Sequence, residues 1–293
     1  MAWKAYRLVY QAKSPIHIGW HTLGYIKLTR YYITGKSIWG AMTANLTRAL
    51  YSYKDYSNVG SELLNKTVLT SYFFPAIDRE SPLLPRFTDT ALLHGKDDMP
   101  VAEFERIFIK SYGQTAVLTE SNTAEDESLH ESEYISPCVE INGVQRQVFF
   151  VGYIFIKEGI NYKGVAIDLQ NIEQAISEIY VGGDRKYGWG NLSLFGKPQD
   201  CVDIFGYTIK DMKSGNLEIS LGLNEPIPAH LSINSAAKLK GDIEPLVGMD
   251  YETSKGFGQK VSKAEICWMP GSLCLDDNAI FKMGEYGILQ THA

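Results

Sequence analysis

Cysteine is scarce in this chain, and its copies are too widely spaced to suggest a structural metal or a disulfide framework. The sequence of 293 residues contains no Cys-x-x-Cys pair. Zinc ribbons and small disulfide-stabilised domains need closely spaced cysteines. We therefore expect reduced thiols, no metal site and no cofactor. The cysteines are Cys138, Cys201, Cys267 and Cys274.

Long apolar runs are also missing. No stretch approaches the roughly 18 consecutive apolar residues that a membrane-spanning helix requires. The segment Met1–Arg7 places no apolar run behind a basic end, as a secretory signal would. We expect no membrane partner and a cytoplasmic location. With 45% hydrophobic residues, the chain can nevertheless bury one large core or two of moderate size.

Acidic residues are missing from residues 1–54, where eight cations occur. Because the whole chain has a net charge of −6, the part after Lys54 is strongly acidic. General nucleic-acid-binding proteins are basic throughout. One positive lobe on an acidic protein favours a fixed place in an assembly, where the lobe faces a polyanion and the rest faces protein subunits. The alternative is a solvated basic surface. The cations are Lys4, Arg7, Lys13, Lys27, Arg30, Lys36, Arg48 and Lys54.

Hydrophobic periodicity predicts an α+β protein. The expected elements are a strand at 5–12, a helix at 37–49, a strand at 148–156, a helix around 172–179 and a strand at 191–195. Residues 55–125 show no sustained period, so we expect a long insertion at about 55–147. With one more strand inside it, the order fits a ferredoxin-like (RNA-recognition-type) βαββαβ domain over residues 1–197.

The rest of the chain, residues 198–293, predicts a second, mostly β domain. It carries no strong helical pattern, and the boundary lies in the segment Gly196–Asp200. The expected strands are 204–210, 216–223, 261–269 and 279–289.

Two glycine-rich loops combine glycine with cations and aromatics. Glycine lets a backbone approach a ligand closely, cations neutralise phosphates, and aromatic faces stack on bases. We therefore predict RNA contacts in both loops; the alternative is a glycine hairpin whose aromatics only pack. The first loop offers Gly182, Gly183, Arg185, Lys186, Tyr187, Gly188, Trp189 and Gly190. The second, at 254–260, offers Lys255, Gly256, Phe257 and Gly258.

A third candidate contact lies at the start of the first predicted helix. Gly35, Lys36 and Ser37 would present backbone N–H groups, the positive end of the helix dipole and a cation, which together suit a phosphate. Lys27 and Arg30 precede them in the acid-free region and join the predicted set. The alternative is an ordinary helix cap.

Three sets of motifs occur in series along the chain. They are Ser14–Gly19 followed by Tyr32–Ala41, then Asn122–Ile135, then Gly182–Gly190. Together they resemble the RAMP superfamily, the RNA-binding subunits of CRISPR effector complexes, specifically those of type III systems; Thr34 stands where that family commonly has proline. The resemblance implies guide RNA as ligand, other effector subunits including a large polymerase-like one as partners, and only indirect contact with target RNA.

Some members of this superfamily cut RNA, so the sequence must also be searched for catalytic residues. The resemblance implies that target-slicing members use an Asp after the first strand, and Ile16–Lys36 contains no Asp or Glu. His17 and His21 are the weak candidates for a metal-independent general base.

We therefore expect a non-catalytic subunit that caps or lines the 5′ repeat-derived tag of the guide RNA in antiviral defence. The alternatives are a guide-processing or target-cleaving endoribonuclease of the same superfamily, and a two-domain interaction protein without RNA contact.

Overall fold

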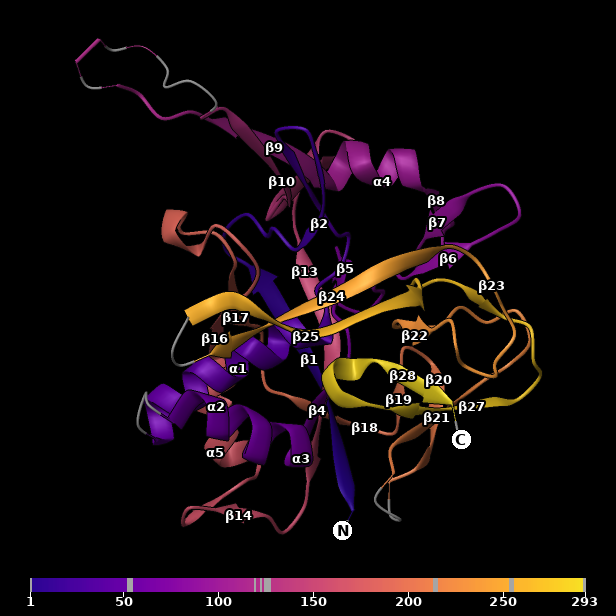
Figure 1. The fold of residues 1–293 in the computed structure, drawn as a ribbon. Coiled ribbons are helices and arrows are strands. Elements are labelled where there is room, and N and C mark those ends of the chain that lie inside the picture. Colours follow the sequence, from indigo (N-terminus) through magenta and orange to yellow (C-terminus); the bar gives the residue numbers. More distant parts are fainter. Residues whose placement is uncertain are drawn as a thin grey trace.

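A computed structural model shows a mixed α+β fold that is mostly sheet with few helices (Figure 1). It describes residues 2–51, 55–118, 120–121, 123, 128–212, 216–252 and 256–291. Within these ranges no helix is both long and apolar enough to cross a membrane.

The largest sheet of the N-terminal part has the order β16-β17-β1-β13-β4, with antiparallel neighbours throughout. Its strands are β1 (Trp3–Ala12), β4 (Val68–Thr70), β13 (Phe149–Lys157), β16 (Glu178–Tyr180) and β17 (Asn191–Leu194). β5 (Phe74–Ala76) pairs with β13 and β18 (Gln199–Cys201) with β1. Helix α1 (Gly35–Leu50) lies between β1 and β4 in the chain, and α5 (Leu169–Ser177) between β13 and β16. The strands and helices predicted in these regions are confirmed to within a few residues.

The two faces of this sheet are covered by different parts of the chain. Successive side chains of a strand point to opposite faces. Leu8 and Tyr10 of β1 belong to one core with α1 and α5, and the Tyr10 hydroxyl donates to the carbonyl oxygen of Ile176 (2.7 Å). Trp3 and Ala5 belong to a second core, which they share with strands of the C-terminal part. Part of the sheet face opposite the helices is therefore closed by residues beyond 200.

The predicted insertion forms short elements rather than one folded unit. They are α2 (Tyr56–Asn58), η2 (Val59–Leu64), α3 (Asn65–Thr67), β4, β5, β6 (Pro85–Phe87), β7 (Leu92–His94), β8 (Met99–Pro100), α4 (Val101–Phe108), β9 (Ile109–Gln114), β10 (His130–Ile135), β11 (Cys138–Ile141) and β12 (Val144–Gln147). β9 and β10 join β2 (Gly19–Leu23) and β3 (Ile26–Thr29) in a four-stranded sheet, order β2-β3-β10-β9. This sheet lies at the top of Figure 1, away from α1 and α5. A small hairpin, β14 (Asn161–Tyr162) and β15 (Val165–Ala166), follows β13.

The C-terminal part is built from strands, as predicted. Its main sheet has eight strands in the order β19-β20-β21-β27-β28-β22-β25-β24. They are β19 (Asp203–Ile204), β20 (Tyr207–Asp211), β21 (Glu218–Leu221), β22 (Leu231–Ser232), β24 (Ile243–Glu252), β25 (Gly256–Trp268), β27 (Ala279–Met283) and β28 (Leu289–Thr291). β23 (Leu239–Lys240) pairs with β26 (Leu273–Cys274).

Three predictions in this part are wrong. The expected single strand at 204–210 is a hairpin of β19 and β20, because Phe205 and Gly206 between them both have positive φ. The expected single strand at 279–289 is two strands, separated by the 3-10 turn η4 (Glu285–Gly287), because Tyr286 and Gly287 both adopt left-handed backbone conformations that end a strand. The expected glycine loop at 254–260 is largely strand, because Gly256 and Phe257 begin β25 and pair with Glu252 and Tyr251 of β24. Lys255 lies outside the described residues.

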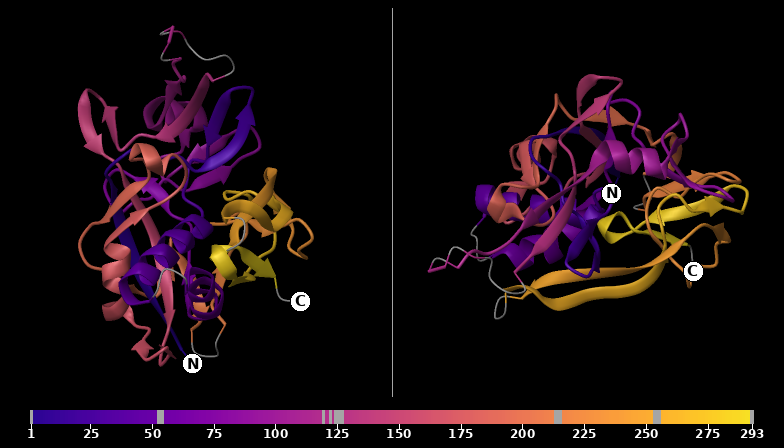
Figure 2. Two further views of the ribbon diagram at one scale, coloured as in Figure 1. Left: turned by 60° about the vertical axis from the view of Figure 1, so that its left-hand side comes forward. Right: turned by 90° about the horizontal axis from the view of Figure 1, so that it is seen from above.

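The β24–β25 hairpin crosses the front of the molecule in Figure 1. The right-hand view of Figure 2, from above, shows the same hairpin along one side of the molecule, reaching from the C-terminal sheet toward α1. The sequence pattern predicted the second half of β25 but not β24.

Candidate nucleic-acid interface

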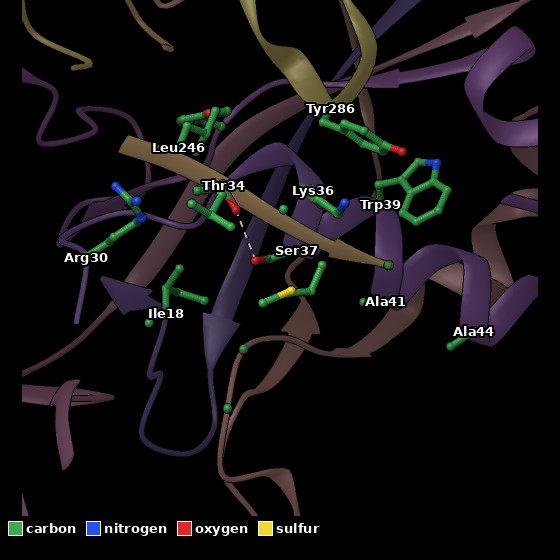
Figure 3. A pocket seen from close by; sticks show the side chains of 18 of the residues that line it. Ile18, Arg30, Thr34, Lys36, Ser37, Trp39, Ala41, Ala44, Leu246 and Tyr286 are labelled. Carbon is green, nitrogen blue, oxygen red and sulfur yellow. Dashed lines mark hydrogen bonds between the residues drawn. The ribbon is translucent and has the colours of Figure 1, made fainter. Parts of the chain in front are cut away.

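A groove of about 740 Å³ opens between the start of α1, the first glycine loop, strand β24 and the turn at η4 (Figure 3). Four segments that are far apart in the sequence thus meet at one place. The predicted contact residues that line it are Arg30, Lys36, Ser37, Gly182, Gly183 and Arg185. The two motifs singled out in the first helix and the first glycine loop therefore border the same groove.

The start of α1 faces this groove without an acidic residue in its first turn. Thr34 is the N-cap, and its hydroxyl pairs with the Ser37 hydroxyl (3.0 Å). A helix start carries N–H groups beyond those used in its own hydrogen bonds, together with the positive end of the dipole. Lys36 adds a cation, whose Nζ lies 4.9 Å from the centre of the Tyr286 ring. This end of the groove can accept an anion.

Gly35 is required by close packing at the same helix start. A Cβ at this position would overlap the backbone carbonyl of Tyr286 in the η4 turn. Only glycine therefore allows α1 to touch the C-terminal part here. Sequence reasoning missed Tyr286 as part of the site, and its residue type alone carried no signal of that role.

The first glycine loop is held against the segment that follows β1. The Gly183 N–H donates to the carbonyl oxygen of His17 (2.9 Å), and the Gly190 N–H donates to that of Pro15 (2.8 Å). Gly182 has a φ of +74°, and a Cβ there would overlap the His17 carbonyl. At these positions glycine permits a close approach of protein to protein, and this approach fixes the loop at the rim of the groove.

The tip of the loop carries its exposed cations and tyrosine. Residues Arg185–Tyr187 form one 3-10 turn (η3), preceded by Asp184 in the left-handed conformation at φ +53°. The Arg185 and Lys186 side chains are exposed, and the side chain of Tyr187 is 64% exposed. These three residues are available to an external ligand.

Trp189 occupies a different environment from Tyr187. It is only 8% exposed, and its ring centre lies 5.0 Å from that of Tyr134 on β10 and 6.5 Å from that of Tyr112 on β9. The edge-to-face geometry is typical of aromatic packing. Trp189 thus attaches the loop to the four-stranded sheet, and we favour Tyr187 over it as the residue that stacks on a base.

Arg30 lines the groove, but its charge is already partnered inside the protein. It is buried and donates to the carboxylate of Glu244 on β24. The same carboxylate accepts hydrogen bonds from Trp20 Nε1 and His230 Nε2. Because His230 donates through Nε2, its Nδ1 accepts from the Tyr72 hydroxyl (2.7 Å). This network, which sequence reasoning missed, anchors β24 to the N-terminal part.

Electrostatics favours the ionised form of Glu244. Burial alone would raise its pKa, but the hydrogen bond from His230 and the positive charge of Arg30 outweigh burial and lower the pKa to about 2. A buried cation paired in this way is not free to bind a phosphate, so we leave Arg30 out of the proposed phosphate-binding set.

His17, His21 and Lys27 do not line the groove. His17 is buried, and its Nδ1 donates to the main-chain carbonyl of Glu133 (2.7 Å). His21 is exposed, with its ring centre 4.6 Å from that of Trp20. Lys27 is exposed on β3, opposite Thr22 and Ser132. Across the described part of the chain, no group of three or more His, Cys, Asp or Glu side chains could hold a metal ion.

Comparison with known proteins adds a fold-level likeness. No family model and no curated protein matches the sequence. The structure is similar to a chain of the type III-B Cmr-beta complex bound to cognate target RNA and AMPPnP, with a TM-score of 0.55, 11% identity, and coverage of 92% of this chain and 85% of that one. A Cmr-beta structure with cognate target RNA alone gives a TM-score of 0.55 and 12% identity, covering 92% and 86%.

This chain therefore has the fold of a subunit of a type III effector complex. The resemblance predicted from the motifs is confirmed at the level of the fold.

Proposed function

We propose that this chain is a non-catalytic guide-RNA-binding subunit of a type III CRISPR ribonucleoprotein effector, and that it caps or lines the 5′ repeat-derived tag. One observation carries the proposal. The start of α1 and the first glycine loop, about 150 residues apart in the sequence, border one groove with Lys36 and Arg185 on its walls. The fold likeness to Cmr-beta chains supports the same assembly.

In this proposal residues 1–197 form a ferredoxin-like, RNA-recognition-type domain and residues 198–293 a second domain. The strand order β17-β1-β13-β4, with α1 and α5 as the intervening helices, is the order that two interleaved βαβ units produce. Since part of the sheet face opposite the helices is closed by the C-terminal part, the RNA would run along the groove at the start of α1 instead.

The groove residues would bind RNA in two ways, through charge and through stacking. Lys36, Ser37 and Arg185 are suited to phosphates, and the exposed Tyr187 to a base or ribose. Lys27, on the neighbouring sheet, would extend the positive surface. The partners are the guide RNA, the other effector subunits including a large polymerase-like one, and target RNA indirectly, in the cytoplasm.

Removing both cations of the η3 turn tests this assignment. We expect Arg185→Ala with Lys186→Ala to weaken binding of guide RNA and to lower the slope of log K against log salt by about one to two, because each lost phosphate contact releases one counterion fewer. Filter binding across a salt series measures both quantities. The matched control is Lys197→Ala with Lys210→Ala, two exposed cations that do not line the groove. An unchanged slope in the η3 variant, or no RNA binding by the wild-type chain, would contradict the proposal.

The non-catalytic part of the proposal predicts wild-type RNA processing after loss of either histidine. His17 is held by a main-chain carbonyl, which orients the ring without the carboxylate that a strong general base commonly uses. We expect His21→Ala and His17→Asn to process guide and target RNA at wild-type rates in the assembled complex. Asparagine keeps a donor for the Glu133 carbonyl but cannot act as a general base. The His17→Asn variant therefore removes the candidate base without removing this hydrogen bond. Loss of a metal-independent cut with intact RNA affinity would instead identify an endoribonuclease.

A further inference from the structure

Among the side chains that the structure describes, the outer face of the β24–β25 hairpin is apolar. The exposed described side chains of this face are Ile243, Pro245, Val247 and Met249 on β24, and Val261, Ala264 and Ile266 on β25. Trp268, opposite Ile243 at the end of this face, is half-buried. In the strand register Pro245 lies opposite Ile266, and Val247 opposite Ala264. We call the seven exposed residues the apolar ladder.

Strand alternation explains why the ladder has one face only. Glu244 lies between Ile243 and Pro245 and points to the interior, where it holds Arg30 and His230. The residues on either side of it must then point outward. The network that anchors the inner face of β24 therefore also displays the apolar ladder to the exterior.

An exposed surface of this kind is unusual. The five larger aliphatic residues of the ladder are each about half exposed, and clustered apolar exposure of this kind commonly marks an interface. β24 is moreover the edge strand of its sheet. Natural edge strands usually carry charges or proline that discourage pairing, whereas of the described outward side chains of β24, Ile243, Pro245, Val247 and Met249, only Pro245 does so.

The size and the chemistry of the ladder indicate which kind of molecule binds it. A stable interface takes about 20–30 residues from each partner, so two copies of this chain that met only at the seven residues of the ladder would be held too weakly. RNA is bound through cations and aromatic faces, and the seven residues of the ladder are neither. The occupant is therefore a different protein that is also held by further contacts.

The ladder adjoins the proposed RNA groove. Val247 and Met249 belong to the ladder and also border the groove. A protein docked on the ladder would thus sit beside the bound RNA. We propose that the apolar ladder is the docking surface for another protein subunit of the same ribonucleoprotein, one that presents an uncharged, aliphatic surface; this inference rests on the proposed function.

The test uses the full chain, tagged and purified from cells that assemble the whole complex. Ile243→Glu and Ile266→Glu change side chains that are 53% and 48% exposed and do not line the groove. A carboxylate facing an apolar partner loses its hydration without a compensating bond. We expect at least one co-purifying protein subunit to fall about tenfold relative to this chain, while the amount of guide RNA per chain stays unchanged.

The matched control is Ile280→Glu on β27, which is 36% exposed in the same sheet, lies outside the ladder and faces Ser220 in the register. It should leave subunit composition unchanged. Ile266→Thr, which keeps β-branching, replaces the Glu variants if either fails to give a wild-type melting curve, and it should reduce the same subunit.

Three results would overturn the inference. Unchanged subunit composition in the ladder variants would show that no protein docks there. Loss of RNA with retained subunits would identify an RNA surface. A dimer of the isolated chain in sedimentation that Ile266→Glu dissociates would identify a second copy. If the wild-type chain purifies with neither RNA nor other subunits, the proposed function fails, and the docking partner with it.

Discussion

Replacing Glu244 with Ala is expected to lower the free energy of unfolding by about 3–5 kcal/mol, because it leaves the buried Arg30 guanidinium without its counter-charge. His230 and Trp20 lose their acceptor in the same variant. Since these residues join β24 to the N-terminal part, the groove should also lose its β24 wall, and guide RNA affinity should fall. Urea denaturation of the full chain and filter binding measure the two effects.

An exposed ion pair provides the control for this result. Glu158 contacts Lys4 at 2.9 Å, both side chains are exposed, and exposed pairs contribute little to stability. Glu158→Ala should therefore shift the urea midpoint little. If both variants shift it equally, the buried network does not hold the two parts together.

The interactions of Glu244 should also make the stability of the protein depend on pH in the acid range. The folded pKa of Glu244 is about 2, against 4.5 for an unperturbed Glu. A carboxyl with a lowered folded pKa adds stability that is fully present above the unfolded pKa and is lost as the pH falls toward the folded one. The stability of the wild type should thus approach that of Glu244→Gln between pH 4.5 and pH 2. Parallel pH profiles for the two proteins would contradict the assignment.

Gly182→Ala should be the second severe change, with a loss of about 3 kcal/mol in folding free energy. The left-handed φ of +74° costs an alanine about 1–2 kcal/mol. The added Cβ would also overlap the His17 carbonyl, which accepts from the Gly183 N–H. Relieving that overlap moves the loop away from the groove, so guide RNA affinity should fall with stability.

Gly188→Ala separates the two contributions. Gly188 has a φ of +83°, but a Cβ there would meet no atom within 4 Å. It should cost only the backbone strain of about 1–2 kcal/mol and leave the loop in place. Thermal unfolding and filter binding measure the stability and the RNA affinity of both variants. Equal losses would mean that close packing against His17 does not position the loop.

Local sequence patterns were sufficient to predict the helix whose start borders the candidate groove. The helix at 35–50 starts within two residues of its predicted position, because its apolar spacing and the preceding Thr-Gly are local signals. The strand order could not be read in the same way, since pairings such as β1 with β13 join residues 138 to 154 positions apart. The loop predicted at 254–260 shows the converse error: a glycine-rich composition favours a loop, but pairing with β24 extends strand β25 to Phe257 and Gly256.

Charge distribution and motif chemistry were determined by the sequence alone. An acid-free N-terminal region, a cation at a helix start and an arginine-lysine-tyrosine turn between glycines are properties of neighbouring residues, so no fold is needed to find them. Which of these groups remain available was decided by the tertiary structure. Glu244, more than 200 positions away, takes up the charge of Arg30, and Tyr134 covers Trp189, whereas Arg185 and Tyr187 stay exposed. The physical reason is that burial and ion pairing depend on long-range contacts, which form only when the two parts of the chain pack together.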